Sequence, residues 1–310
     1  MTYPSQHTTT LDERDGTQVG IVAPAHRLSA GLRLGQVRLQ VADLGRSLDY
    51  YQNVLGFRVV SRTPTSASLA ALGDDTPVIQ LEERRGAAPV PHQGRLGLYH
   101  FAILVPDRGS LGRFIGHLME IGARAGASDH LVSEALYLRD PDGLGIEVYA
   151  DRPRSSWRTA NRQIRMDTTP LDLNSLVEAG GEAPWLGMPF GTAVGHVHLH
   201  VGDLDQASDF YHTGLGLDKI VWSYPGALFL SSGGYHHHLG VNTWAGAGAP
   251  RAGDDDARLL DWRIELPHVD DVNATIASLQ AAGYPAVATQ DGWRVTDPWG
   301  TSLVLATRRS

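Results

Sequence analysis

One strand–helix–strand unit recurs four times along the 310-residue chain, and this repeat restricts the fold more than any other feature of the sequence. The clearest copies are GQVRLQVADLGRSLDYYQNVLGFRVV, from Gly35, and GHVHLHVGDLDQASDFYHTGLGLDKI, from Gly195. Each opens with alternating apolar residues, which predict a β-strand. An aspartate then stands where it would cap a helix, at Asp43 and at Asp203. The repeated unit is therefore a strand, a helix and further strands.

Two further copies begin at Tyr99 (YHFAILVPDRGS) and at Leu260 (LDWRIELPHVDD), and their last strands follow the turn sequences DPDG and DPWG. We place the four modules at residues 34–84, 97–152, 193–244 and 258–308. The predicted organisation is an N-terminal arm (1–33), a first pair of modules (34–152), a linker (153–190) and a second pair of modules (191–310).

Composition excludes several classes of function. The chain has no cysteine, which rules out disulfides, thiolate metal sites and a cysteine nucleophile. Its 26 basic and 34 acidic residues give a net charge of −8 without any basic cluster, so nucleic acid is not an expected partner. No segment is long and apolar enough to predict a membrane span or a secretory signal. We therefore expect no membrane association and a cytoplasmic location.

Aligning the modules brings a set of metal-binding residue types into register. The position that opens the first strand holds Gln36, His100, His196 and Asp261 in turn. In the last strand of module two, Glu147 lies among apolar residues, where an unpaired carboxylate would be costly to bury. Two histidines and one carboxylate form the facial triad of non-haem Fe(II) oxygenases, which leaves coordination positions open.

A simpler interpretation of the same residues remains open at this point. A single histidine at a strand start is more often a surface or hydrogen-bonded residue than a ligand, and Glu147 has Arg152 and Arg154 nearby as ion-pair partners. The register argues for the metal site, because His100 and His196 occupy the same position in two copies of the repeat.

The four βαβββ modules and the strings GHVHLHVGDL, YHFAILV and DPDGLGIEVYADRP resemble the vicinal oxygen chelate superfamily (glyoxalases, bleomycin resistance proteins and dioxygenases). Within it, they resemble extradiol dioxygenases of the catechol 2,3-dioxygenase type. The resemblance implies an α+β fold in which the modules form two barrels or half-barrels. Because the ligands fall in modules two and three, we expect modules to pair 2 with 3 around the metal and 1 with 4 as its counterpart without metal.

The resemblance also implies roles for individual residues. His100, His196 and Glu147 correspond to the metal ligands, Tyr137 and His130 to residues that contact the substrate and assist catalysis, and His238 to the acid–base histidine. In GGYHHHLGVN, strand alternation would put His236 and His238 on one face and His237 on the other. This assigns His236 to the substrate side and a structural role to His237.

The function implied is an Fe(II)-dependent dioxygenase that uses O2 to open a catechol to a 2-hydroxymuconic semialdehyde, as a homo-oligomer. Mn(II) accepts the same ligands. Two alternatives share the fold: a glyoxalase-type isomerase with another metal, and a metal-free binding protein of the bleomycin-resistance kind.

Overall fold

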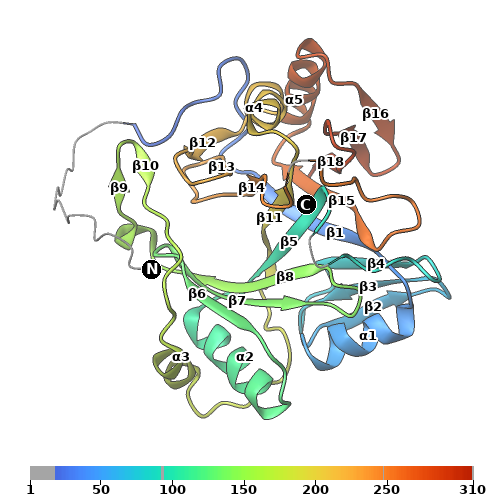
Figure 1. Cartoon of the computed structure of the whole chain (residues 1–310), viewed down its shortest axis with the longest axis vertical. Coiled ribbons are helices and arrows are strands. Elements are labelled where there is room, and N and C mark those ends of the chain that lie inside the picture. The colour runs from blue at the N-terminus through green and yellow to red at the C-terminus, as the bar shows by residue number, and fades with distance from the viewer. Residues whose placement is uncertain (1–17, 92–93, 247, 309–310) are drawn as a thin grey trace.

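The computed structural model describes residues 18–91, 94–246 and 248–308, and four βαβββ modules follow one another in them (Figure 1). Module 1 consists of β1 (Arg33–Val41), α1 (Leu44–Asn53), β2 (Arg58–Arg62), β3 (Ser66–Ala70) and β4 (Ile79–Glu83). Module 2 consists of β5 (Gly97–Leu104), α2 (Arg108–Glu120), β6 (Gly126–Asp129), β7 (Ser133–Arg139) and β8 (Gly145–Asp151).

The second half of the chain repeats this order after a linker. The linker contains a 3₁₀ turn (Arg154–Ser156), β9 (Thr159–Ala160), β10 (Gln163–Ile164) and α3 (Leu173–Gly180). Module 3 consists of β11 (Ala193–His200), α4 (Leu204–Ser208), a π-helical turn (Asp209–Gly214), β12 (Asp218–Val221), β13 (Ala227–Ser231) and β14 (Leu239–Asn242). Module 4 consists of β15 (Arg258–Leu266), α5 (Val269–Ala281), β16 (Ala286–Thr289), β17 (Gly292–Thr296) and β18 (Ser302–Thr307).

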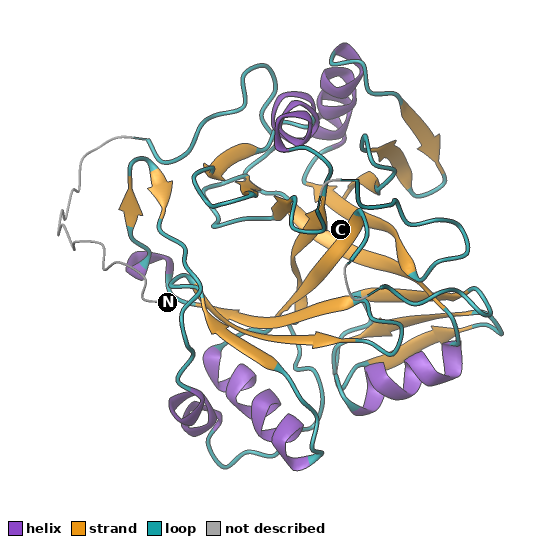
Figure 2. Cartoon of the chain, in the orientation of Figure 1, coloured by secondary structure: helices purple, strands orange, loops and turns teal. Residues whose placement is uncertain are grey.

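Two eight-stranded sheets confirm the predicted α+β fold and the predicted pairing of modules. One sheet has the order β16-β17-β18-β15-β1-β4-β3-β2 and joins modules 4 and 1. The other has the order β12-β13-β14-β11-β5-β8-β7-β6 and joins modules 3 and 2. In each sheet the first strands of two modules meet antiparallel at the centre. The helices lie on the outer sides of the curved sheets (Figure 2). Each sheet is therefore built across the linker.

The predicted aspartate caps begin the helices of modules 1 and 3. Asp43 accepts a hydrogen bond from the backbone N–H of Arg46, and Asp203 accepts one from Gln206. Such caps satisfy N–H groups that have no partner inside the helix.

The DPDG and DPWG turns tie neighbouring modules together. Tyr51, on α1, donates its buried hydroxyl to the Asp140 carboxylate in the turn of module 2, over 3.3 Å. Tyr211 donates in the same way to Asp297 in the turn of module 4, over 2.9 Å. Both aspartates also accept backbone N–H groups of their own turns. The repeat therefore extends to the contacts between modules.

Residues 18–32 and the linker both lie against module 3. Arg27 makes a bidentate ion pair with Asp218 on β12, and Leu28 belongs to the main hydrophobic core. The remainder of the predicted arm, residues 1–17, lies outside the described residues. In the linker, the Gln163 side chain accepts the backbone N–H groups of Trp222 and Ser223. The hairpin β9–β10 is thereby held beside the end of β12.

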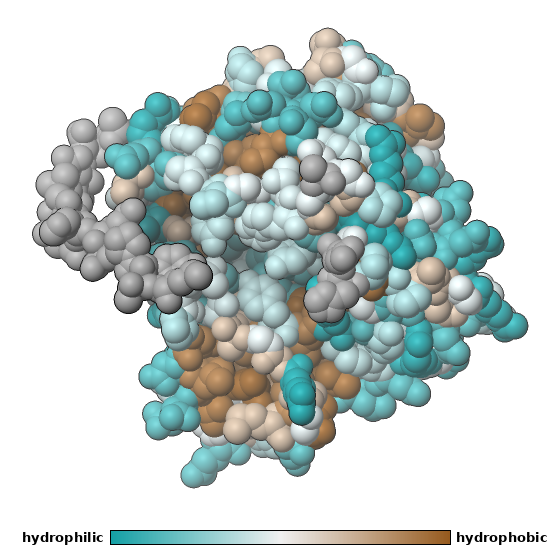
Figure 3. Space-filling view, viewed as in Figure 1, coloured by the Kyte–Doolittle hydropathy of each residue, from teal (hydrophilic) through white to brown (hydrophobic). Residues whose placement is uncertain are grey.

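Apolar side chains gather on one area of the surface. Figure 3 shows hydrophobic residues over the region where Figure 1 places α2 and α3. These two helices and the residue after α2 expose large apolar side chains, namely Met119, Ile121, Leu173 and Val177. None of the helices in the described part of the chain is long and apolar enough to cross a membrane.

Candidate metal centre and active site

Three central strands of the module 2–3 sheet bring the predicted triad together. His100 lies on β5, His196 on the neighbouring β11, and Glu147 on β8, the other neighbour of β5. Glu147 Oε2 is 2.9 Å from Nε2 of His100 and 3.1 Å from Nε2 of His196. All three side chains are buried, and their ligand atoms lie within 4.8 Å of one another. Among the described residues, no other group of three potential metal ligands lies so close together.

The donor atoms fit a divalent metal ion. Metal–ligand bonds of about 2.1 Å that meet at a right angle separate neighbouring donor atoms by about 3.0 Å, close to the two distances given above. In addition, His100 Nε2 is buried, and none of the described residues gives it a hydrogen bond of proper geometry. A buried nitrogen without a partner is costly in a protein interior. A metal ion would satisfy it.

The protonation states of the triad also suit a metal. Burial lowers the pKa of the His100 imidazole, against the opposing effect of Glu147. Burial would raise the pKa of the Glu147 carboxyl, but the imidazoles of His196 and His100 outweigh it, and this pKa lies well below its ordinary value. A neutral His100 and an ionised glutamate are the forms that bind metal.

A cavity of about 250 Å³, the inner cavity, opens onto the triad. Tyr137 and His130, which the resemblance assigned to the substrate site, both line it. Tyr137 lies directly across the β7–β8 ladder from Glu147, and its hydroxyl is 2.6 Å from His130 Nε2. His130 Nδ1 is 2.8 Å from the carbonyl of Asp167. Since a carbonyl only accepts, Nδ1 carries the proton and Nε2 accepts from Tyr137.

His237, and not His238, faces the triad. Its ring lies 4.1 Å from the ring of His196, and it lines the inner cavity. His238 instead accepts the backbone N–H of Ser232 through Nδ1 and does not line the cavity. The placement predicted for His238 is therefore wrong. Strand alternation failed because β14 begins only at Leu239, so the three histidines precede the strand.

The prediction that His236 lies on the substrate side is also wrong. His236 is fully buried outside the cavity lining, with Nε2 2.9 Å from Asp151 and Nδ1 2.7 Å from Nδ1 of His237. Because the carboxylate accepts, His236 carries its proton on Nε2 and accepts at Nδ1 from His237. His237 thus keeps a lone pair on Nε2. Burial, with nearby histidines, lowers the pKa of His237 well below its usual value.

The structure adds residues that the sequence analysis missed. His198, two residues after His196 on β11, lines the inner cavity, and its Nε2 is 2.9 Å from Asn242 Nδ2. The alternation of HVHLH places it on the same face as His196. The linker supplies Met166, Asp167 and Thr168 to the cavity wall, and module 3 supplies Tyr224, Phe229 and Trp244. Apart from His198 on β11 and Phe229 on β13, these residues lie outside the regular strands, where no periodicity marks them.

In the module 1–4 sheet, an ion-pair network takes the place of the triad. Asp261 matches His100 in register, as predicted, and Arg38 lies opposite Asp261 just as His198 lies opposite His100. Arg38 binds Asp261 over 2.7 Å and Glu82 over 2.6 Å. Val304 takes the position of Glu147. Fixed charges of opposite sign therefore occupy this barrel.

Comparison with known proteins agrees with this geometry. The glyoxalase/bleomycin resistance protein/dioxygenase superfamily matches residues 33–148 and 193–303. A catechol-2,3-dioxygenase of Bacillus subtilis (strain 168) is 45% identical over 268 residues, which cover 86% of this chain and 93% of that protein.

Two solved structures share the fold at low sequence identity. A Bacillus subtilis protein assigned as a dioxygenase aligns with a TM-score of 0.62 and 15% identity, over 92% of this chain and 87% of that chain. Glyoxalase I from Zea mays aligns with a TM-score of 0.54 and 17% identity, over 89% and 92%. The family match over residues 33–148 and 193–303, together with the 45% identical relative, shows that the chain belongs to the glyoxalase/bleomycin resistance protein/dioxygenase superfamily.

Proposed function

We propose that this protein is an Fe(II)-dependent extradiol dioxygenase that cleaves the ring of a catechol beside its diol, giving a 2-hydroxymuconic semialdehyde. The observation that carries the proposal is the buried set of His100, His196 and Glu147 on the wall of a cavity that also presents His237 and Tyr137. The 45% identical relative, named a catechol-2,3-dioxygenase, supports the same reaction.

His100, His196 and Glu147 would hold the metal. One carboxylate and two neutral imidazoles would leave a divalent ion with residual positive charge, which favours a bound catecholate over neutral catechol. Bound iron would supply a Lewis acid and an electron path between the diol and O2. The inner cavity beside these three residues would hold the catechol.

Tyr137 and His130 form a path for a proton that leaves the substrate. The Tyr137 hydroxyl donates to His130, so its oxygen lone pairs remain available to a catechol hydroxyl in the inner cavity. Burial, followed by the nearby Glu147, raises the pKa of Tyr137 well above its ordinary value. Tyr137 therefore does not hold the negative charge. It passes a proton on to His130, whose other nitrogen is fixed by the Asp167 carbonyl.

His237 has the second proton-transfer role, which the sequence analysis gave to His238. Asp151 and His236 hold His237 with its proton on Nδ1, so the lone pair on Nε2 accepts a proton within the cavity and returns it when the ring opens. His236 and Asp151 orient His237 in the way that the third member of a catalytic triad orients a histidine.

Anaerobic reconstitution with Fe(II), followed by catechol and air, tests the proposal through oxygen uptake and the absorbance of a yellow ring-fission product. Wild type should consume oxygen and form the product, and Glu147→Ala and His196→Ala should lose both together with the bound iron. Gln36→Ala is a matched control, because Gln36 has the register position of His196 in the other sheet. It should keep iron and activity. The same assay after loading with Mn(II) instead of Fe(II) tells which of the two metals supports oxygen uptake.

Two outcomes would contradict the proposal. Bound iron without oxygen uptake on monocyclic and bicyclic catechols would favour a glyoxalase-type isomerase. Failure to bind any divalent metal would favour a metal-free binding protein.

The proposal includes a homo-oligomer in the cytoplasm. The exposed apolar surface over α2 and α3 supports self-association, since large contiguous patches of this kind commonly mark interfaces. A monomer by light scattering would overturn this part alone.

A further inference from the structure

His198 is a buried histidine of the inner cavity that has no role in the mechanism proposed above. It lies on β11 directly opposite His100 in the β5–β11 ladder, and the two rings are 5.0 Å apart. The residue is 4% exposed, and it lines the inner cavity together with the triad. His198 therefore borders the space that a substrate would fill, next to the residues that would hold the metal.

Asn242, on β14, determines which nitrogen of His198 carries the proton. The backbone N–H of Trp244 donates to Asn242 Oδ1 over 3.0 Å, and a backbone N–H cannot accept. This contact identifies the oxygen of the Asn242 amide, so Nδ2 donates to His198 Nε2 over 2.9 Å. An imidazole that accepts at Nε2 carries its one proton on Nδ1. His198 is thus a neutral ring with an N–H donor at Nδ1.

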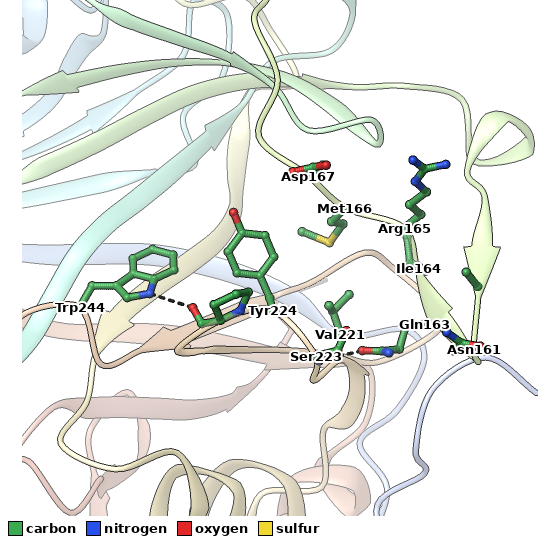
Figure 4. A pocket seen from close by; sticks show the side chains of 12 residues that line it. Asn161, Gln163, Ile164, Arg165, Met166, Asp167, Val221, Ser223, Tyr224 and Trp244 are labelled. Carbon is green, nitrogen blue, oxygen red and sulfur yellow. Dashed lines mark hydrogen bonds between the residues drawn. The ribbon is translucent and has the colours of Figure 1, made fainter. Parts of the chain in front are cut away.

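The Asn242 side chain is itself held from two directions. His200 Nδ1 lies 2.7 Å from the same Oδ1 atom, and the Asn242 side chain is fully buried. Trp244 is fixed in turn, because its indole N–H donates to the Pro225 carbonyl (Figure 4). A reversed amide would turn its NH2 group toward the Trp244 N–H, donor against donor. The protein, and not the ligand, therefore sets the tautomer of His198.

The same contacts turn Nδ1 of His198 toward the triad. In the β11–β14 ladder Asn242 lies opposite His200, whereas Gly240 lies opposite His198. The Cδ2–Nε2 edge of the ring therefore points toward the His200 end of β11. Nδ1 lies on the other edge, which faces the His196 end. In the described part of the chain, the bond to Asn242 is the one hydrogen bond of the His198 ring, so its Nδ1–H is left for a ligand.

The ring is packed tightly enough to keep this direction. One of its faces lies on Gly240, where a Cβ atom would come within 2.9 Å of Cγ, 3.0 Å of Cδ2 and 3.1 Å of Nδ1. The rings of Tyr99 and Phe229 pack edge to face with it, at 5.1 Å and 5.6 Å. Glycine at position 240 is therefore what lets the imidazole lie flat on β14.

The polar groups already assigned to the inner cavity lack such a donor. Tyr137 donates its proton to His130, so it meets a catechol hydroxyl as an acceptor. His237 presents the lone pair on Nε2 and accepts as well. Neither group stabilises a substrate oxygen that has lost its proton. The Nδ1–H of His198 has the opposite polarity.

We propose that His198 is a substrate-binding residue, whose Nδ1–H donates to the ionised oxygen of a catecholate while the other substrate oxygen faces Tyr137. The inference rests on the proposed ring cleavage and adds a substrate contact to it. The strands that carry the two residues, β11 and β7, lie on either side of β5 and β8, so they approach the diol from opposite sides. A hydrogen bond to an ionised oxygen is stronger than one between neutral groups. Asn242 is the positioning residue, because it acts through the tautomer of His198.

His198→Phe keeps a ring on Gly240 and removes the donor. We expect the dissociation constant for catechol, measured by calorimetry without oxygen on the iron-loaded enzyme, to rise about 10- to 100-fold, as when a hydrogen bond to a charged group is lost. Iron content should stay at the wild-type level. His198→Gln should regain most of the affinity, because its amide oxygen can accept from Asn242 while its NH2 group donates into the cavity. His117→Phe, the same change on α2 outside the cavity lining, is the matched control and should bind catechol as wild type does.

Nitrogen-15 NMR of the full-length, metal-free protein measures the tautomer without any turnover. The His198 signals are those that disappear in His198→Phe, and their chemical shifts should show the proton on Nδ1. Asn242→Leu should abolish this preference and weaken catechol binding, which loss of packing alone would not link to the tautomer.

Three results would overturn the inference. One is a wild-type proton on Nε2, and another is wild-type catechol affinity in His198→Phe. The third is a rise in the KM for oxygen in His198→Phe with an unchanged dissociation constant for catechol, which would place the donor beside O2. Failure of the wild-type enzyme to bind or cleave any catechol would instead count against the proposed function, and the NMR result would distinguish that case.

Discussion

Gly145→Ala should disturb the metal site by forcing two strands apart. Gly145 begins β8, two residues before Glu147, and a Cβ atom there would lie 2.0 Å from the backbone carbonyl oxygen of Tyr99 on β5. Real Cβ atoms essentially never come within 3.0 Å of such an atom. The neighbour is backbone, so no rotamer change relieves the clash. The strands must separate by about 1 Å.

This separation is large compared with the tolerance of the site. Glu147 and His100 lie on the two strands that would move, with 2.9 Å between Oε2 and Nε2. Catalytic and metal-binding groups need their geometry within about 0.5 Å, and a misplacement of 1 Å costs about 100-fold in rate. Overpacking in a core costs about 1–3 kcal/mol, or about 2–9 °C in melting temperature for a domain of this size. We therefore expect a folded variant with weakened metal binding.

Three measurements separate these effects: iron content after equilibrium dialysis, kcat/KM by oxygen uptake, and melting temperature. Gly126→Ala is the control, because a Cβ at this exposed position of β6 meets nothing closer than 3.5 Å. It should match wild type in all three. Wild-type iron affinity and activity in Gly145→Ala would refute the argument that the close approach of β8 to β5 sets the ligand geometry.

Three further changes test other parts of the account. His237→Gln should lower kcat by about 10²–10⁴, the usual contribution of an acid–base group, whereas His238→Gln should stay within about threefold; the reverse order in a steady-state assay would restore the original assignment. Burial raises the pKa of Asp140 to about 7. Since the folded state then binds the proton more tightly, the stabilising effect of protonation is complete below about pH 4 and is lost as pH rises to about 7, up to about 4 kcal/mol. Asp140→Asn should remove this slope from urea unfolding curves, and an unchanged slope would contradict the attribution. Arg38→Met should lower the free energy of unfolding by about 2–3 kcal/mol, because it leaves Asp261 buried with a weaker partner, while kcat of the folded enzyme should not change.

The repeat in the sequence was sufficient to predict the fold and the residues that cluster at the proposed metal site. His100 and His196 could be found because the same strand position recurs in every module, and Glu147 because a carboxylate inside an apolar strand requires a partner. The pairing of modules 2 and 3 followed from where the ligands lie. All these inferences depend on periodicity and register, which are local properties of a sequence.

The remainder of the site depends on contacts that have no such signal. The histidine run precedes β14 instead of lying on it, so strand alternation pointed to the wrong histidine. Only the contacts show that Asp151 binds His236 and that His236 in turn orients His237. Met166 and Tyr224 face each other across a cavity although they belong to the linker and to a turn. Contacts between residues so far apart in the sequence leave no periodic pattern in a single sequence.

The two sheets differ at the positions where we propose that the metal binds. Equivalent positions hold His100 and His198 in one and Asp261 and Arg38 in the other. The side chains of the second set form ion pairs, because Arg38 binds both Asp261 and Glu82. The first set leaves a buried His100 nitrogen without a proper hydrogen bond. A metal ion bound by His100, His196 and Glu147 would satisfy this nitrogen, and we expect its free energy of binding to offset the cost of burying the three side chains.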